Sequence, residues 1–319
     1  MATVQGYMGN EKALLFEMTP QVATGQLGAF LAKTQSRNSK HKLLDKFTEI
    51  GPNGTRKFVK SDKTKLEAVP AEMEAKMRAA FGRSGYGASL QKVGWQIRPF
   101  TEAFFKVVDV AARVGSGVGS YGVGRYYVLL AGEDKLLEAS GVILDVKYEP
   151  EPAVSAVLGP EDNDWYHGLF ANEAMRAVEA QRRLTSYTDP FTGWVVVDNK
   201  AYVVRQRSPY KESFDLASLK TYAEFAEYVE QIAVITATSH TRGTVGKSPG
   251  QFKEVVSSAF GSPYARATWG VSVVDIAKSY RLQVLLDFEC FQEYAQSIED
   301  QPDDATEDGE KGDGQAREL

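Results

Sequence analysis

The stretch that decides the fold runs from Lys106 to Leu130 and reads KVVDVAARV (106–114), GSGVGSYGVG (115–124) and RYYVLL (125–130). The first and last parts are rich in β-branched and aromatic residues, which favour β-strands. The middle part is rich in glycine, which adopts loop conformations that other residues avoid. The stretch therefore predicts two strands joined by a glycine-rich loop.

Within that loop, Gly117, Gly119 and Gly122 satisfy the pattern G-x-G-x-x-G, and Ser120 lies between the last two. Dinucleotide-binding turns and the phosphate-covering loops of protein kinases both contain this pattern. In a dinucleotide-binding turn the glycines open a helix, whereas here they lead into a strand, as in a kinase. A glycine-rich hairpin that binds no ligand is the alternative.

The chain continues with a third strand, a helix, a hairpin and then helices. The predicted ranges are a strand at 142–148, a helix at about 170–185, strands at 194–197 and 201–204, and helices at 216–238, 250–260 and 271–298. Asn199, in the short connection of the hairpin, tolerates positive φ. A doubly wound parallel fold would instead alternate each strand with its own helix.

These elements predict an α+β, protein-kinase-like fold, in which an antiparallel five-stranded small lobe with one helix precedes a mostly helical lobe. An N-terminal helical or irregular segment comes before it, with a solvated loop or hairpin around Gly51–Gly54 and a helix over 71–81. The predicted divisions are 1–105, the small lobe at 106–212, the helical lobe at 213–298 and an acidic tail at 299–319.

Lys147 lies on the third predicted strand, where a kinase keeps the lysine that contacts the α- and β-phosphates. That lysine pairs with a glutamate of the following helix, and Glu179 and Glu173 are the candidate partners, of which Glu179, near the middle of the predicted helix, is preferred. Alternatively, Lys147 and Glu179 are unrelated exposed charges.

Composition excludes several other classes of protein. The tail at 299–319 holds nine acidic and two basic residues, which leaves 33 acidic and 35 basic residues in 1–298. A nearly neutral body argues against nucleic acid as the main partner, and the tail lacks the apolar residues that folding needs. Three histidines and a single cysteine cannot build a zinc site of the usual kind. No apolar run reaches the length of a membrane span, so a cytoplasmic protein is expected.

Several segments together resemble an uncharacterised bacterial family, domain of unknown function 2252, over roughly residues 40–295. The segments are VDVA (108–111), GVGSYG (117–122), DVK (145–147), VEAQR (178–182), DPFTGW (189–194) and YVVRQ (202–206). The resemblance implies a distantly kinase-like protein, and it adds Arg205 to the candidate nucleotide contacts. Family members usually carry an upstream G-D-x-H-x-x-N-F-G segment and then an acidic D-F-D segment, which this sequence lacks. The chain is therefore expected to be the C-terminal part of the family pattern.

The sequence thus predicts a kinase-like module that binds a nucleotide, ATP with Mg²⁺, through the glycine loop, Lys147, Glu179 and Arg205. No catalytic residue and no protein metal ligand is assigned, because the expected catalytic Asp and Asn are absent. Phosphoryl transfer would need a separate polypeptide that carries the missing segment. The alternative is a non-catalytic pseudoenzyme or scaffold that serves as an interaction surface.

Overall fold

The computed structural model describes residues 16–52, 54–92, 101–115, 122–132, 141–244 and 249–299. The chain forms two compact units, Ala2–Val255 and Val256–Leu319. The larger unit contains both β-sheets, and the smaller unit is helical in its described part. The predicted divisions at residues 105, 212 and 298 stay predictions.

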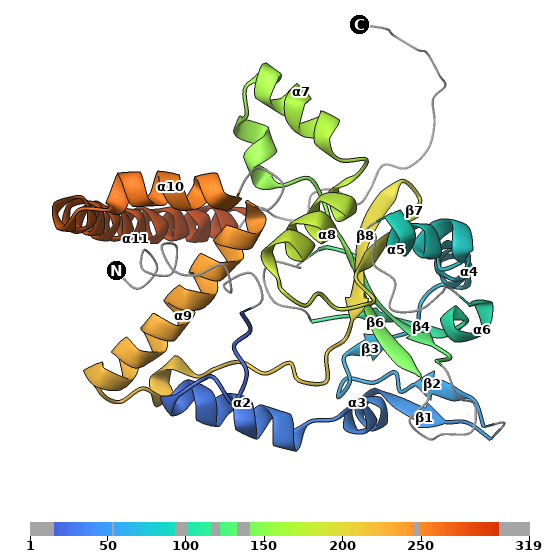
Figure 1. The fold of residues 1–319 in the computed structure, drawn as a ribbon. Coiled ribbons are helices and arrows are strands. Elements are labelled where there is room, and N and C mark those ends of the chain that lie inside the picture. The colour runs from blue at the N-terminus through green and yellow to red at the C-terminus, as the bar shows by residue number, and fades with distance from the viewer. Residues whose placement is uncertain are drawn as a thin grey trace, which may run out of the picture. The chain divides into compact units, whose positions relative to one another are not determined.

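Six antiparallel strands form the main sheet of the larger unit (Figure 1), and their spatial order is β3-β4-β5-β6-β8-β7. The strands are β3 (Leu66–Glu67), β4 (Val107–Arg113), β5 (Arg125–Leu130), β6 (Val142–Tyr148), β7 (Gly193–Val197) and β8 (Lys200–Gln206). From β3 to β6, consecutive strands are neighbours in the sheet. After β6 the chain forms a short 3₁₀ helix and two α-helices and returns at the sheet edge as β7, and β8 then pairs with both β6 and β7. The fold is thus mixed α+β with an antiparallel sheet.

The sheet contains the predicted strands, but the prediction of five strands is wrong by one. The additional strand, β3, has only two residues, and it pairs with the end of β4. Leu66 is almost fully buried, which anchors this short strand. Two residues are too few for an alternating pattern to be recognised in a sequence.

The hairpin between β7 and β8 turns at Asp198 and Asn199, whose φ angles are 49° and 58°. Two positive φ values in a two-residue loop are the signature of a type I′ turn, which matches the twist of the flanking strands. The connection expected around Asn199 is confirmed.

One face of the main sheet, the α4 face, is covered by helices that precede β4. They are α4 (Ala71–Ala80), the π-helical turn η2 (Arg83–Gly87), α5 (Ala88–Lys92) and α6 (Glu102–Phe105). Met77, Phe81 and Tyr86 from these elements are buried against the strands in the largest core cluster. Burial of such a side chain stabilises the fold by roughly 1.5–3 kcal/mol. The helix predicted over 71–81 is confirmed.

The opposite face, the α8 face, is covered in two parts. Over β7 and β8 lies α8 (Glu173–Leu184), whose Ala174 and Val178 are buried against Trp194 and Ala201. Asn172 caps this helix, because its side chain accepts a hydrogen bond from the Met175 N–H.

Over β4 and β5 on the α8 face lie α3 (Lys40–Phe47) and a hairpin of β1 (Thr48–Ile50) and β2 (Arg56–Phe58). The rings of Phe47 and Phe58 pack against Tyr127 of β5. The buried carboxylate of Asp109, in β4, accepts a hydrogen bond of 2.8 Å from the Phe58 N–H. The hairpin expected around Gly51–Gly54 is therefore present and fixed to the main sheet.

The remaining described helices are α2 (Gly25–Arg37), η4 (Ala153–Val157), α7 (Pro160–Leu169), η5 (Leu216–Ser218), α9 (Tyr222–Gly243), α10 (Pro249–Phe260) and α11 (Pro263–Glu299). A capping box starts α9, in which the side chains of Thr221 and Glu224 satisfy backbone N–H groups. In the smaller unit, Phe260 packs against Trp269, with ring centroids 5.1 Å apart. In the described part of the chain, no helix is long and apolar enough to cross a membrane.

Candidate functional site

Charged side chains gather on the α8 face at the end of the sheet where segment 115–124 joins β4 to β5. Arg125 lies opposite Lys147, Lys147 opposite Val203, and Val203 opposite Trp194. Residues directly opposite each other in antiparallel strands share a face of the sheet. Since Trp194 packs beneath α8, Arg125 and Lys147 lie on the α8 face.

The alternation of a strand places Asp145 on the same face as Lys147, and Asp145 lies opposite Arg205 of β8. The Asp145 carboxylate is only 4% exposed. The Arg125 guanidinium binds it in a bidentate manner, with Nε 2.7 Å from Oδ1 and Nη2 2.5 Å from Oδ2. Arg205 Nη2 lies 3.6 Å from Oδ2, and its side chain is 46% exposed. One buried carboxylate is thus shared by two arginines, of which one reaches solvent.

On the chain that follows β8, the charge of Lys211 also acts on this carboxylate, and Arg207 lies near Lys211. Burial lowers the pKa of Lys211, and the positive charges of Arg207, Arg125 and Arg205 lower it further, against the opposing charge of Asp145. Burial alone would raise the pKa of Asp145. The hydrogen bonds and charge of Arg125, with the charges of Arg205 and Lys211, instead hold the pKa of Asp145 below its usual range.

We call Arg125, Arg205, Arg207, Lys211 and Asp145 the basic cluster. It contains four cations and one carboxylate, and the charge of Arg205 also acts on a second, partly buried carboxylate, Asp189, so the group still carries a surplus of positive charge. Arg207 and Lys211 follow the end of β8, and the Arg207 N–H donates to the Ile143 carbonyl of β6 over 2.8 Å. Such a surplus in a partly buried position favours an anion, and guanidinium groups match the oxygens of phosphate and carboxylate.

Lys147 lies beside the basic cluster and is connected to α8 by a chain of ion pairs. Its Nζ is 3.8 Å from Glu149 Oε2, and Glu149 Oε1 is 4.0 Å from Arg176 Nη2 on α8. Arg176 Nε in turn lies 2.6 Å from Glu173 Oε2. The structure therefore connects the predicted lysine to the predicted helix through Glu149 and Arg176.

Glu179, the predicted partner of Lys147, is also on α8. Its Oε2 lies 3.6 Å from Arg183 Nε, one turn further along the helix. In the described part of the chain, Lys147 and Glu179 form ion pairs with these other residues and not with each other. The role of Glu179 as the partner of Lys147 stays a prediction.

The glycine loop is described only at its ends. Gly117, Gly119 and Ser120 lie outside the described residues. Gly122 has a φ of 70°, and a Cβ added there would meet nothing within 4 Å. The Tyr148 N–H donates to the Gly124 carbonyl over 2.9 Å, which fastens the C-terminal end of the loop beside Lys147.

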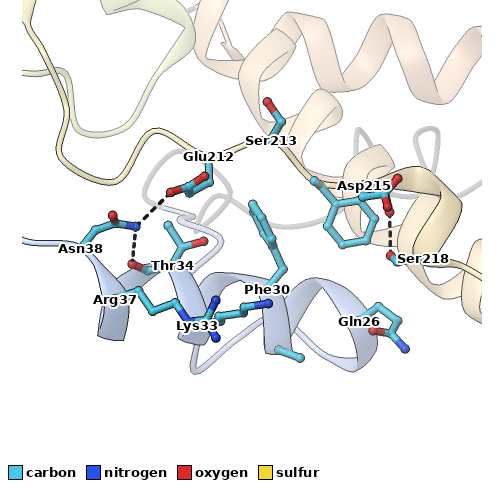
Figure 2. A pocket seen from close by; sticks show the side chains of 12 residues that line it. Gln26, Phe30, Lys33, Thr34, Arg37, Asn38, Glu212, Ser213, Asp215 and Ser218 are labelled. Carbon is cyan, nitrogen blue, oxygen red and sulfur yellow. Dashed lines mark hydrogen bonds between the residues drawn. The ribbon is translucent and has the colours of Figure 1, made fainter. Parts of the chain in front are cut away.

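A cavity of about 530 Å³ lies elsewhere in the larger unit, between α2 and residues 212–218. Figure 2 shows Phe30 and Lys33 on the helix and Glu212 on the facing segment, where the Glu212 carboxylate accepts a hydrogen bond from Asn38. The cavity walls carry Lys33 and Arg37 on one side and Glu212 and Asp215 on the other. Because these charges balance, the cavity favours neither an anion nor a cation.

The basic cluster was only partly visible in the sequence, which pointed to Arg205 but not to Arg125, Asp145, Arg207 or Lys211. One signal was available, because Asp145 interrupts an otherwise apolar strand, and a charge buried in a strand needs a partner. Among the described residues, no group of three or more His, Cys, Asp and Glu side chains is placed to hold a metal ion.

The fold and the site thus define a mixed α+β protein with an antiparallel sheet and a basic cluster on one face of it. A family described as an uncharacterized protein conserved in bacteria, DUF2252, matches residues 3–294, and the chain belongs to that family. The match begins nearer the N-terminus than the predicted residue 40. Searches of curated proteins and of solved structures found no match.

Proposed function

We propose that the protein is a kinase-like module that binds the phosphates of a nucleotide on the α8 face of the sheet. One observation carries the proposal: Arg125, Lys147 and Arg205 lie on three adjacent strands of this face. They lie at or beside the sheet end where the glycine-rich segment 115–124 joins β4 to β5. Glycine backbone and clustered cations are two of the means by which proteins hold phosphate groups.

The succession of elements supports the same proposal. In a protein kinase, a glycine-rich loop joins the first two strands, the third strand carries the phosphate-binding lysine, and the next helix supplies a glutamate. Here the loop joins β4 to β5, Lys147 lies on β6, and Glu179 lies on α8, which follows η4 and α7 in the chain. We propose that the loop covers the phosphates and that Lys147 contacts them, with Arg125 and Arg205 beside it.

Catalysis is not assigned to a residue of this chain. Phosphoryl transfer requires compensation of the charge on the transferred group and a residue that accepts the proton of the attacking hydroxyl. The described carboxylates of the site, Asp145 and Glu149, are both paired with basic side chains. We propose that a separate polypeptide supplies the catalytic groups if the protein takes part in transfer.

A non-catalytic scaffold is the second candidate, and the ion pair between Lys147 and Glu149 favours it. In a scaffold, these charges would serve only to join β6 to α8. The two functions differ in whether a nucleotide stabilises the folded protein, since only a ligand that binds the native state raises the melting temperature.

Thermal unfolding with and without ATP tests the proposal. A ligand at about 100 times its dissociation constant stabilises by roughly 2.7 kcal/mol. For a protein of this size, that corresponds to a rise of about 4 °C in melting temperature. The measurement is made with and without Mg²⁺ on the parent, on Lys147→Ala and on Lys57→Ala, which removes an exposed lysine of β2.

We expect ATP to raise the melting temperature of the parent and of Lys57→Ala equally and that of Lys147→Ala much less. The absence of any rise in the parent would refute nucleotide binding and leave the scaffold. An equal rise in melting temperature in all three proteins would show that Lys147 is not part of the nucleotide site.

A further inference from the structure

We infer, on the basis of the proposed function, that the site binds the phosphate chain of a nucleoside triphosphate without a divalent metal ion. The positive charge that a metal would supply comes instead from Lys147 and the basic cluster. Two features of the geometry carry the inference: the carboxylates paired with basic side chains and the exposed surplus of cations.

The carboxylates of the site are already occupied by basic side chains. Both oxygens of Asp145 accept hydrogen bonds from Arg125, at 2.7 and 2.5 Å. The two oxygens of Glu149 are divided between Lys147, at 3.8 Å, and Arg176, at 4.0 Å. Mg²⁺ takes oxygen ligands such as carboxylates in a near-octahedral arrangement. To bind Asp145 it would have to displace Arg125, and at Glu149 it would compete with the charges of Lys147 and Arg176.

The cations of the basic cluster outnumber its carboxylate, and part of their charge is accessible. Arg125 neutralises Asp145, which leaves Arg205 as a second guanidinium whose side chain is 46% exposed. A planar guanidinium donates two parallel hydrogen bonds to phosphate oxygens. Arg205 is therefore placed to bind a phosphate group directly, with Arg207 and Lys211 nearby.

The electrostatics of Lys211 agrees with this geometry. Its pKa is lowered mainly by burial and also by the charges of Arg207, Arg125 and Arg205, against the opposing charge of Asp145, so these arginines repel a further positive charge. A metal ion that arrives with the nucleotide adds two positive charges to this repulsion. A triphosphate without metal, which carries about four negative charges, instead relieves it. The geometry therefore favours the metal-free ligand over its magnesium complex.

Calorimetric titration of the full chain with ATP tests this, once in EDTA and once with a saturating excess of MgCl₂ at matched ionic strength. We expect the affinity for ATP in EDTA to exceed that for the magnesium complex by about tenfold or more, which corresponds to the loss of one charge-assisted contact. Arg205→Ala and Lys211→Ala should each weaken binding in EDTA by about tenfold on the same basis. Lys57→Ala should leave it unchanged.

The outcomes separate this inference from the proposed function. Binding that requires Mg²⁺ would overturn the metal-free inference and leave the nucleotide site in place. Binding in neither condition would overturn both. If ATP binds in EDTA with an affinity that neither Arg205→Ala nor Lys211→Ala weakens, that result would also overturn the inference, because the positive charge that replaces the metal would then come from other residues. Circular dichroism of each variant verifies that the protein is folded.

Discussion

The buried ion pair between Asp145 and Arg125 makes Asp145→Asn the most informative substitution for the architecture of the site. The carboxylate is 4% exposed and the arginine side chain 12% exposed, and two hydrogen bonds join them. Removal of one partner of a buried pair costs about 3–5 kcal/mol, because the other charge is left without compensation. Asparagine keeps one oxygen acceptor for Arg125, so we expect the lower value, about 3 kcal/mol.

Urea denaturation followed by circular dichroism measures this loss. With a denaturant dependence of about 3 kcal/mol per molar urea, a loss of 3 kcal/mol lowers the unfolding midpoint by about 1 M. The matched control is Asp198→Asn, which removes an exposed carboxylate in the turn between β7 and β8 and leaves Lys76 with its second partner, Glu72. The control should hardly move the midpoint.

The pH dependence of the loss adds a second criterion. The pKa of Asp145 is lower in the folded protein than in the unfolded chain, where an aspartate has a pKa of about 3.9. Its contribution to stability is therefore complete above that value and is lost as the pH falls through the folded pKa. The difference between parent and Asp145→Asn should be constant from about pH 7 to pH 5 and shrink below about pH 4. Equal losses in Asp145→Asn and Asp198→Asn would refute the reasoning.

Two further predictions concern the scaffold around the site. Gly193→Ala, at the start of β7, would place a Cβ 2.6 Å from the buried Ser89 Oγ. In urea denaturation, this substitution should lower the free energy of unfolding by about 1–3 kcal/mol. Gly168→Ala, in an open position of α7, should instead raise the free energy of unfolding by about 0.5–1 kcal/mol. Thr221→Ala removes the cap of α9 and should cost about 1 kcal/mol, visible as faster amide hydrogen exchange at Glu224. If the amide exchange rate of Glu224 is the same in Thr221→Ala as in the parent, the cap is dispensable.

The regular elements around the site were predictable from local sequence, because each depends on residues close together in the chain. Alternation and β-branched residues indicated the strands that became β4, β5 and β6, and the spacing of Met77 and Phe81 indicated α4. The residues Asp198 and Asn199 indicated a turn with positive φ. The strand β3 was missed because two residues are too few to show the alternation of buried and exposed side chains that identifies a strand.

The partners of the charged residues depended on tertiary structure. Asp145 meets Arg125 and Arg205 because β6 lies between β5 and β8, and β8 lies there only because the chain between β6 and β7 crosses to the sheet edge first. No local pattern encodes that order, since the pairing joins residues far apart in sequence. The ion pair between Lys147 and Glu149, by contrast, is local, because residues two apart along a strand share a face. The sequence by itself determined which segments are strands and where the glycines and basic residues lie. Only the packing of the sheet decided which charges share a face.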